Sequence, residues 1–206
     1  MARLKVGVLI SGRGSNLQAL LDACGDPAFP AEIALVLSNV AGAHGLDRAS
    51  AAGVATQVID HKEFPSREAF DAEMDRALRA AGIELVCLAG FMRLLSVGFV
   101  ESWQGRMINI HPSLLPAFKG LRTHAQALAA GVKLHGCTVH YVTPALDDGP
   151  IIAQAAVPVL AGDSEEDLAA RVLAVEHRLY PLALKVIAEG KAYSADPKLS
   201  LLNPSV

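Results

Sequence analysis

Asparagine and histidine stand two residues apart in the stretch Asn109-Ile110-His111-Pro112. On a strand, residues i and i+2 point to the same side, so these two polar side chains project together, opposite Ile110. Both can donate hydrogen bonds to negative charge that develops on a carbonyl oxygen. Pro112 ends the strand, and open α/β sheets bind ligands at the carboxyl ends of their strands. We therefore predict an oxyanion site here; a structural role for a buried histidine is the alternative.

A carboxylate that could serve this histidine occurs in the stretch Leu146-Asp147-Asp148-Gly149-Pro150. The sequence Asp-Gly-Pro is typical of turns, so a solvated turn is the simplest interpretation, above all for Asp148. For Asp147 the alternative is a partnership with His111. A nearby carboxylate favours the protonated form of an imidazole, which donates hydrogen bonds.

The glycine-rich stretch of residues 11–16, Ser-Gly-Arg-Gly-Ser-Asn, lies between an expected strand and an expected helix. Glycines let a ligand approach the backbone closely, and a helix start offers unpaired N–H groups, which together suit an anion. The dinucleotide fingerprint is incomplete, because Leu17 takes the third glycine position and Ser38-Asn39 stands where an acidic residue is needed. A small phosphate monoester is the better candidate. A tight turn capped by Ser15 or Asn16, with no ligand, is the alternative.

The elements that must position these residues alternate between short apolar runs and amphipathic stretches. Strands are predicted at residues 5–10, 33–38, 55–59, 85–89 and 107–111. Helices are predicted at residues 16–24, 45–52, 66–81 and 96–103. This alternation indicates an α/β fold with a mostly parallel, Rossmann-like sheet and helices on both faces.

The pattern changes in the last third of the chain. Residues 136–142 and 151–158 read as strands whose connection is too short for a helical crossover, which predicts an antiparallel pair. A long helix follows at residues 164–188 and opens with a capping box, Ser-Glu-Glu-Asp. Residues 191–206 have weak signals and read as a tail. We find no linker or repeat, so one domain spanning residues 1–206 is expected.

Composition excludes several classes of protein. Among 206 residues, 18 Lys and Arg against 21 Asp and Glu leave a net charge of −3, which argues against broad nucleic-acid binding. No apolar run approaches the roughly 18–20 residues of a membrane span, and no signal peptide is recognisable. The cysteines Cys24, Cys87 and Cys137 are odd in number and widely spaced, so no disulfide framework or metal site is expected, and a cytoplasmic location fits.

Four segments together resemble the folate-dependent glycinamide ribonucleotide formyltransferases. They are residues 10–17 (ISGRGSNL), 88–93 (LAGFMR), 108–116 (INIHPSLLP) and 146–150 (LDDGP). The resemblance implies the formyltransferase fold and transfer of a formyl group from 10-formyltetrahydrofolate, as co-substrate, to the amine of glycinamide ribonucleotide in purine synthesis. It implies small-molecule partners only, no metal, and a monomer or weak homodimer.

The resemblance also implies residue roles. The catalytic residues would be Asn109, His111 and Asp147. The ribonucleotide would be held by Gly14, Ser15, Asn16 and Glu176. The folate would contact Arg67, Met92, Arg93, Leu94, Leu95, Asn109, Thr143, Pro144, Ala145 and Leu146.

Three positions depart from the family pattern. Asp148 stands where a glycine is common, Lys119 where a proline is common, and Leu173 where a polar ribonucleotide contact is expected.

Other activities remain open. A formyltetrahydrofolate hydrolase shares this chemistry but usually carries an N-terminal regulatory domain, and methionyl-tRNA formyltransferase needs a C-terminal nucleic-acid-binding domain. A non-catalytic folate- or nucleotide-binding module has no need of an oxyanion site.

Overall fold

The computed structural model describes residues 2–190, which fall into two units, residues 1–109 and 110–206. The expectation of one domain stays a prediction. The predicted tail, residues 191–206, lies outside the described residues.

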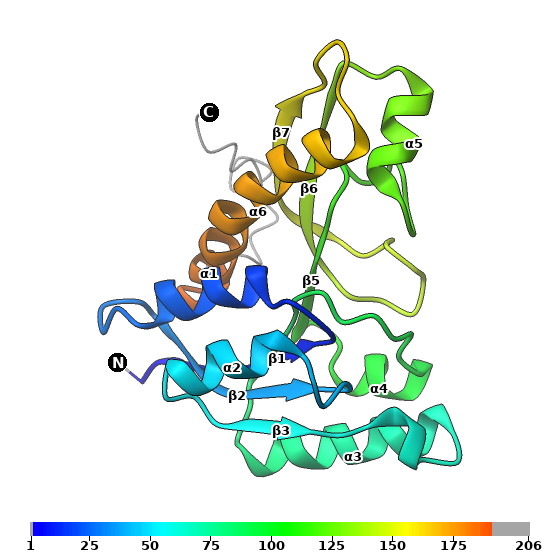
Figure 1. Ribbon diagram of the computed structural model, residues 1–206. Coiled ribbons are helices and arrows are strands. Elements are labelled where there is room, and N and C mark those ends of the chain that lie inside the picture. The colour runs from blue at the N-terminus through cyan, green and yellow to red at the C-terminus, as the bar shows by residue number, and fades with distance from the viewer. Residues whose placement is uncertain (1, 191–206) are drawn as a thin grey trace. The chain divides into compact units, whose positions relative to one another are not determined.

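The first unit is built on a parallel sheet (Figure 1). Its strands are β1 (Leu4–Ile10), β2 (Ala31–Ser38), β3 (Thr56–Val58), β4 (Leu85–Leu88) and β5 (Met107–His111), the last of which ends in the second unit. They lie in the order β3-β2-β1-β4-β5, and every neighbouring pair is parallel. All four residues of β4 are buried, as expected for a central strand that is covered on both faces.

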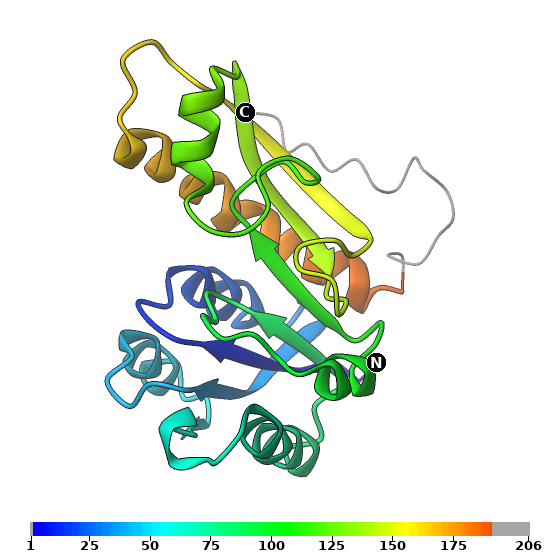
Figure 2. The same cartoon turned by 90° about the vertical axis from the view of Figure 1, so that its right-hand side faces the viewer.

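Helices cover both faces of this sheet. They are α1 (Ser15–Cys24), α2 (His44–Ala51), α3 (Arg67–Ala80) and α4 (Val97–Ser102), with a short 3-10 turn at His61–Glu63. A Cβ added at Gly7 would meet Leu78 of α3, whereas one added at Gly45 of α2 would meet Ile10. Side chains alternate between the two faces of a sheet along a strand, so positions 7 and 10 of β1 point to opposite faces. Helices α2 and α3 therefore lie on opposite faces of the sheet. Figure 2 shows α1 and α3 likewise on opposite sides of the sheet.

The second unit contains an antiparallel pair and two helices. They are β6 (Leu134–Tyr141), β7 (Ile151–Pro158), α5 (Thr123–Ala130) and α6 (Glu165–Ala188). The apolar face of α6 packs on β6 and β7. Its predicted capping box is present, with the Ser164 hydroxyl accepting from the Asp167 N–H.

The predicted fold class is confirmed: mostly parallel strands, a C-terminal antiparallel pair, and helices on both faces of the parallel sheet. The sequence missed α5. Its N-cap is Arg122 with a φ of 54° and no capping side chain, so no helix-start signal was available there.

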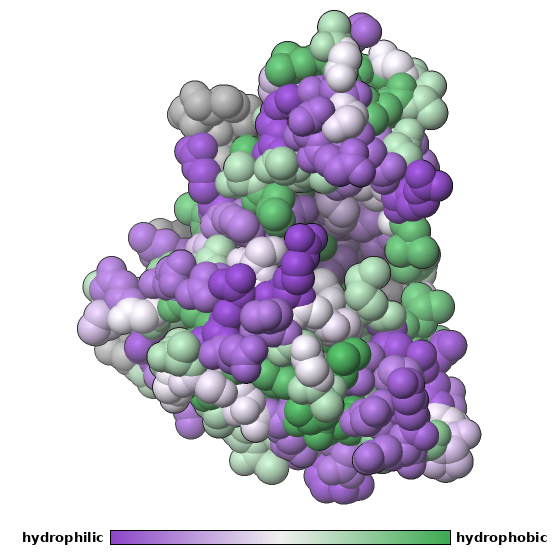
Figure 3. All heavy atoms as spheres, in the orientation of Figure 1, coloured by the Kyte–Doolittle hydropathy of each residue, from purple (hydrophilic) through white to green (hydrophobic). Residues whose placement is uncertain are grey.

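Hydrophilic and hydrophobic residues are interspersed on the face drawn in Figure 3. Within residues 2–190, none of the helices combines the length and the apolar character needed to cross a lipid bilayer.

Candidate active site

The two loops expected to hold substrate in the first unit meet at one place in the sheet. Strand β2 lies beside β1 and β3 lies beside β2, whereas β4 lies on the opposite side of β1. The strand order therefore reverses between β1 and β4, and α/β sheets bind ligands beyond the carboxyl ends of such a pair. Residues 11–16 follow β1 and residues 90–95 follow β4, so both loops begin at this switch point.

Gly14 is required by the first of these loops. It has a φ of 69°, and an added Cβ would lie 2.6 Å from the Gly45 Cα. Gly14 is the N-cap of α1, and no side chain caps this helix end, so the expectation that Ser15 or Asn16 caps it is wrong. An uncapped helix start directs backbone N–H groups at the space where an anion would bind.

The second loop carries apolar side chains on its surface. Met92 is 69% exposed, Leu94 is 61% exposed and Val97, at the start of α4, is 56% exposed. Arg93 is also exposed, Leu95 is half-buried, and its neighbour Ser96 donates its N–H to the buried Asp71 carboxylate at 2.6 Å. Exposed apolar groups on an anchored loop suit a flat, partly apolar ligand.

In the second unit, His111 is 6% exposed and both ring nitrogens face acceptor oxygens. Nε2 lies 3.1 Å from the Phe118 carbonyl oxygen, and Nδ1 lies 3.5 Å from Oδ2 of Asp147. A carbonyl can only accept, so we assign a proton to Nε2 in every charge state of the ring. Nδ1 is then the nitrogen that faces the Asp147 carboxylate.

Asp147 is held by a backbone hydrogen bond and lies beside two histidines. Its Oδ2 accepts the Gly120 N–H at 2.9 Å, and its Oδ1 lies 3.9 Å from Nε2 of His140. His140 donates Nδ1–H to the Tyr141 carbonyl at 2.9 Å, and burial lowers the pKa of His140. His140 is therefore a neutral neighbour of Asp147, and only the fold reveals this contact.

The loops that supply these contacts contain backbone conformations that are uncommon for residues other than glycine. Phe118, Arg122 and Asp147 have φ values of 54°, 54° and 48°. Such conformations cost free energy and persist where surrounding structure enforces them, often at functional sites. They aim the Phe118 carbonyl and the Asp147 carboxylate at the imidazole of His111.

Two of the three departures from the family pattern contact each other. The Lys119 ammonium forms an ion pair with the Asp148 carboxylate. The same hydrogen bond and charge lower the pKa of Asp148. Because Lys119 lies between Phe118 and Gly120, this pair joins the two loops that hold His111 and Asp147.

We expect separate Lys119→Met and Asp148→Asn substitutions to lower kcat roughly two- to fivefold each, the range expected when an exposed ion pair is broken. The exchanged pair, Lys119→Asp with Asp148→Lys, should recover most of the loss because it restores the attraction. Steady-state kinetics at low and high salt measure both effects. Equal losses in the single variants and in the exchanged pair would show that the ion pair does not hold the loops.

Two further histidines pack near the catalytic candidate. The His135 ring contacts the rings of His124 and Phe118 edge-on, with centroids 5.2 and 5.8 Å away. Burial, together with the nearby His124, lowers the pKa of His135 to about 4, and burial also lowers the pKa of His124. Both are neutral side chains of the interior near neutral pH.

The His135 pKa predicts how stability varies with pH. Between about pH 6.5 and 4 the unfolded chain binds a proton that folded His135 does not, so the free energy of unfolding falls as pH falls. The loss is about 1.4 kcal/mol for each unit of pKa difference. Urea unfolding at pH values from 7.5 to 4.5 measures this loss of free energy of unfolding. The free energy should vary less with pH in His135→Phe than in the wild type. His44→Ala, a control at an exposed histidine, should vary as the wild type does. Parallel profiles for wild type and His135→Phe would contradict the assignment.

The other predicted residues are placed by their elements. Asn109 and His111 occupy alternate positions of β5, and Asn109 is partly exposed. Glu176 is 6% exposed on α6, where its charge adds to burial in raising the pKa of Cys137. Arg67, the first residue of α3, is exposed. Residues 143–146 lie in the β6–β7 connection, with Leu146 58% exposed.

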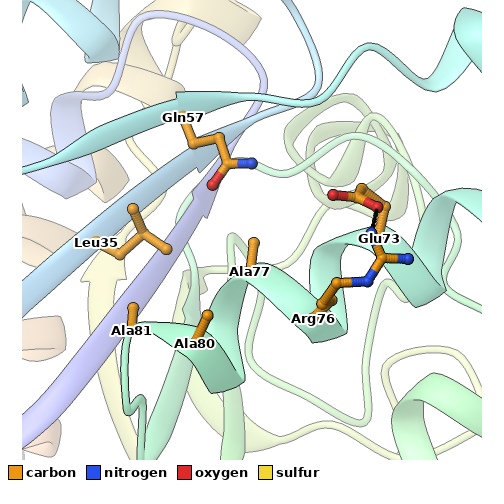
Figure 4. Close-up of a pocket in the computed structure, with 7 residues that line it drawn as sticks. All are labelled: Leu35, Gln57, Glu73, Arg76, Ala77, Ala80 and Ala81. Atoms are coloured by element: carbon orange, nitrogen blue, oxygen red, sulfur yellow. Dashed lines mark hydrogen bonds and ion pairs between the residues drawn. The ribbon is translucent and has the colours of Figure 1, made fainter.

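A hollow of about 380 Å³ lies elsewhere in the first unit, between α3 and the strands β2 and β3 (Figure 4). Its lining consists of Leu35, Gln57, Glu73, Arg76, Ala77, Ala80 and Ala81. None of these is a predicted site residue. Within residues 2–190, no group of three or more metal-ligating side chains is found there or elsewhere.

Comparison with known proteins supports the class that the fold and site suggest. A model of the formyl transferase family matches residues 4–184. Phosphoribosylglycinamide formyltransferase of Escherichia coli is 50% identical over 188 residues, which cover 91% of this chain and 89% of the relative. The phosphoribosylglycinamide formyltransferase structure from Brucella melitensis is 57% identical, with a TM-score of 0.88, and the match covers 94% of this chain and 100% of that one.

The chain also matches part of much longer proteins. The trifunctional purine biosynthetic protein adenosine-3 of Drosophila pseudoobscura is 58% identical over 190 residues. The chain spans 14% of that relative's length and 19% of the Gallus gallus relative's length.

A parallel α/β sheet with loops at its switch point, and a buried pair of His111 at the end of β5 with Asp147 of the β6–β7 connection, are features typical of α/β enzymes that bind small ligands at strand ends. The chain belongs to the formyl transferase family, and within it to the phosphoribosylglycinamide formyltransferases.

Proposed function

We propose that this protein transfers a formyl group from 10-formyltetrahydrofolate to the amine of glycinamide ribonucleotide, a step of purine synthesis. The observation that carries the proposal is the buried pair of His111 Nδ1 and Asp147 Oδ2, 3.5 Å apart and held by the backbone. The family membership supports the same reaction. An acid–base pair that includes a protonated imidazole suits acyl transfer through an oxyanion.

The reaction needs no covalent enzyme intermediate. The amine lone pair forms a bond to the formyl carbon, and the carbonyl electrons move to the oxygen. The Asn109 amide and the positive charge of the His111 imidazolium stabilise that oxygen. When the carbonyl re-forms, the bond from carbon to N10 of the folate breaks; the amine loses one proton and N10 gains one. Asp147 balances the charge of the imidazolium and passes this proton.

The substrate contacts are proposed from the loops at the switch point. Gly14, Ser15 and Asn16 would bind the ribonucleotide phosphate at the start of α1, with Glu176 as a further ribonucleotide contact. The folate would lie against the exposed apolar loop, and its proposed contacts are Arg67, Met92, Arg93, Leu94, Leu95, Asn109, Thr143, Pro144, Ala145 and Leu146. Fixing both substrates converts an encounter in solution into reaction at close range.

We further propose that the chain acts without a metal ion, as one domain and as a monomer or weak homodimer. Cys24, Cys87 and Cys137 are buried and none of the three forms a disulfide, which supports a cytoplasmic location.

The decisive experiment follows deformylation of 10-formyltetrahydrofolate spectroscopically, with and without glycinamide ribonucleotide. The proposal expects rapid deformylation only when the ribonucleotide is present, with stoichiometric formylation of its amine. Deformylation at the same rate without the ribonucleotide would identify a hydrolase instead. Tight binding of the folate with no turnover under either condition would identify a binding module.

A further inference from the structure

One serine side chain lies between the two loops of the switch point. The Ser11 hydroxyl oxygen accepts the Met92 N–H at 2.8 Å and donates to Oδ1 of Asn39 at 2.6 Å. The Ser11 N–H also donates to the Gly90 carbonyl at 3.1 Å. Two hydrogen bonds therefore join the residue that opens the glycine-rich turn to the loop after β4.

The partners of this serine leave it little freedom. Asn39 is 4% exposed, and its Nδ2 lies 3.2 Å from Nδ1 of His61. Because Oδ1 of Asn39 accepts from Ser11, the asparagine amide is fixed with Nδ2 toward His61. The serine hydroxyl must then point its proton at Asn39, and its lone pair remains for the Met92 N–H.

The turn is also fixed on its other side. The Gly12 carbonyl accepts the Gly45 N–H at 3.0 Å, which ties the turn to the first residues of α2. One side of the turn is thus bonded to α2, and the other side is bonded through Ser11 to the loop at residues 90–92. Met92 itself is 69% exposed, so its side chain packs little against the rest of the unit.

We propose that Ser11 is a positioning residue that couples the two substrates: an anion bound at residues 12–16 orders the loop of residues 90–95 through the Ser11 hydroxyl, and folate binding orders the turn in return. The inference rests on the proposed function, because it takes the ribonucleotide phosphate as the anion and the formyl folate as the ligand of the second loop. Coupling between sites is reciprocal, so each ligand raises the affinity for the other by the same factor.

The test measures the affinity for tetrahydrofolate, which cannot transfer a formyl group, by calorimetry without and with saturating glycinamide ribonucleotide. In the wild type we expect the ribonucleotide to tighten folate binding by about five- to tenfold. Ser11→Ala should reduce that factor to about one while each ligand alone binds within roughly threefold of the wild type. Ser11→Thr retains the hydroxyl and should recover the coupling.

Ser38→Ala is the matched control, because Ser38 ends the neighbouring strand β2 and its hydroxyl bonds only within its own turn, to the N–H and carbonyl of Val40. This variant should keep the wild-type coupling. A second readout requires no variant: the ribonucleotide alone should slow hydrogen exchange of the Met92 amide.

Several outcomes would overturn the inference. Coupling that persists in Ser11→Ala is one. A wild type that formylates the ribonucleotide but shows no coupling, or no change in Met92 exchange, is another, and it would leave the proposed function intact. A wild type that binds neither ligand would overturn the proposed function, and the inference with it.

Discussion

His111→Ala is expected to lower kcat by about 10³-fold while the affinity for glycinamide ribonucleotide stays within about threefold of the wild type. The imidazolium stabilises negative charge that exists only in the transition state, and such an interaction contributes to rate rather than to ground-state binding. Steady-state kinetics and calorimetry with the ribonucleotide separate the two quantities.

His44→Ala serves as the matched control, because its side chain is 79% exposed and pairs only with the surface residue Asp47. It should retain the wild-type rate. His111 is buried, so thermal unfolding of the variant must accompany the kinetics. If His111→Ala weakened ribonucleotide binding as much as it lowered the rate, the residue would be structural and the oxyanion role would be lost.

Asp147→Asn is expected to lower kcat by about 10²–10³-fold with a small change in KM for the folate. The amide matches the carboxylate in shape, and its oxygen can still accept the Gly120 N–H. What disappears is the negative charge that faces Nδ1 of His111 at 3.5 Å, together with the ability to carry a proton. The variant therefore removes the negative charge of Asp147 while it keeps the hydrogen bond that holds the loop.

Asp22→Asn controls for the loss of one carboxylate, because Asp22 is exposed on α1 and hydrogen-bonded to Gln18. Its rate should match the wild type. An Asp147→Asn enzyme that retained the wild-type kcat, beside an Asp147→Ala enzyme that did not, would show that the residue serves only as a hydrogen-bond acceptor for the loop.

The elements that were predicted most accurately are those with strong local signals at both ends. Strand β5 has the predicted bounds because Pro112 cannot continue it. Helix α3 begins one residue after the predicted start, because residue 66 is its cap: the Ser66 hydroxyl accepts the Ala69 N–H. Strand β2 begins two residues before the prediction, because its first residues carry no turn signal. Helix α5 was missed for the same kind of reason.

The sequence predicted which residues form the candidate site, but it predicted only part of how they are arranged. The asparagine and histidine share a strand, so their common direction follows from the backbone period alone. The contact between His111 and Asp147 joins residues far apart in the chain, and the sequence raised it only as one of two interpretations. The Lys119–Asp148 pair shows the same limit, because both positions were noticed separately as departures.

The sequence alone determined the order of helices and strands and the chemistry of the candidate residues, because local periodicity, caps and side-chain type are properties of short segments. Only the tertiary structure decided which nitrogen of His111 faces Asp147, and that Ser11 reaches the loop at Met92. In each case a side chain is positioned by a backbone group: the Phe118 carbonyl bonds His111, the Gly120 N–H bonds Asp147, and the Met92 N–H bonds Ser11. Every residue carries the same backbone groups, so their positions depend on how distant segments fold together and not on side-chain type.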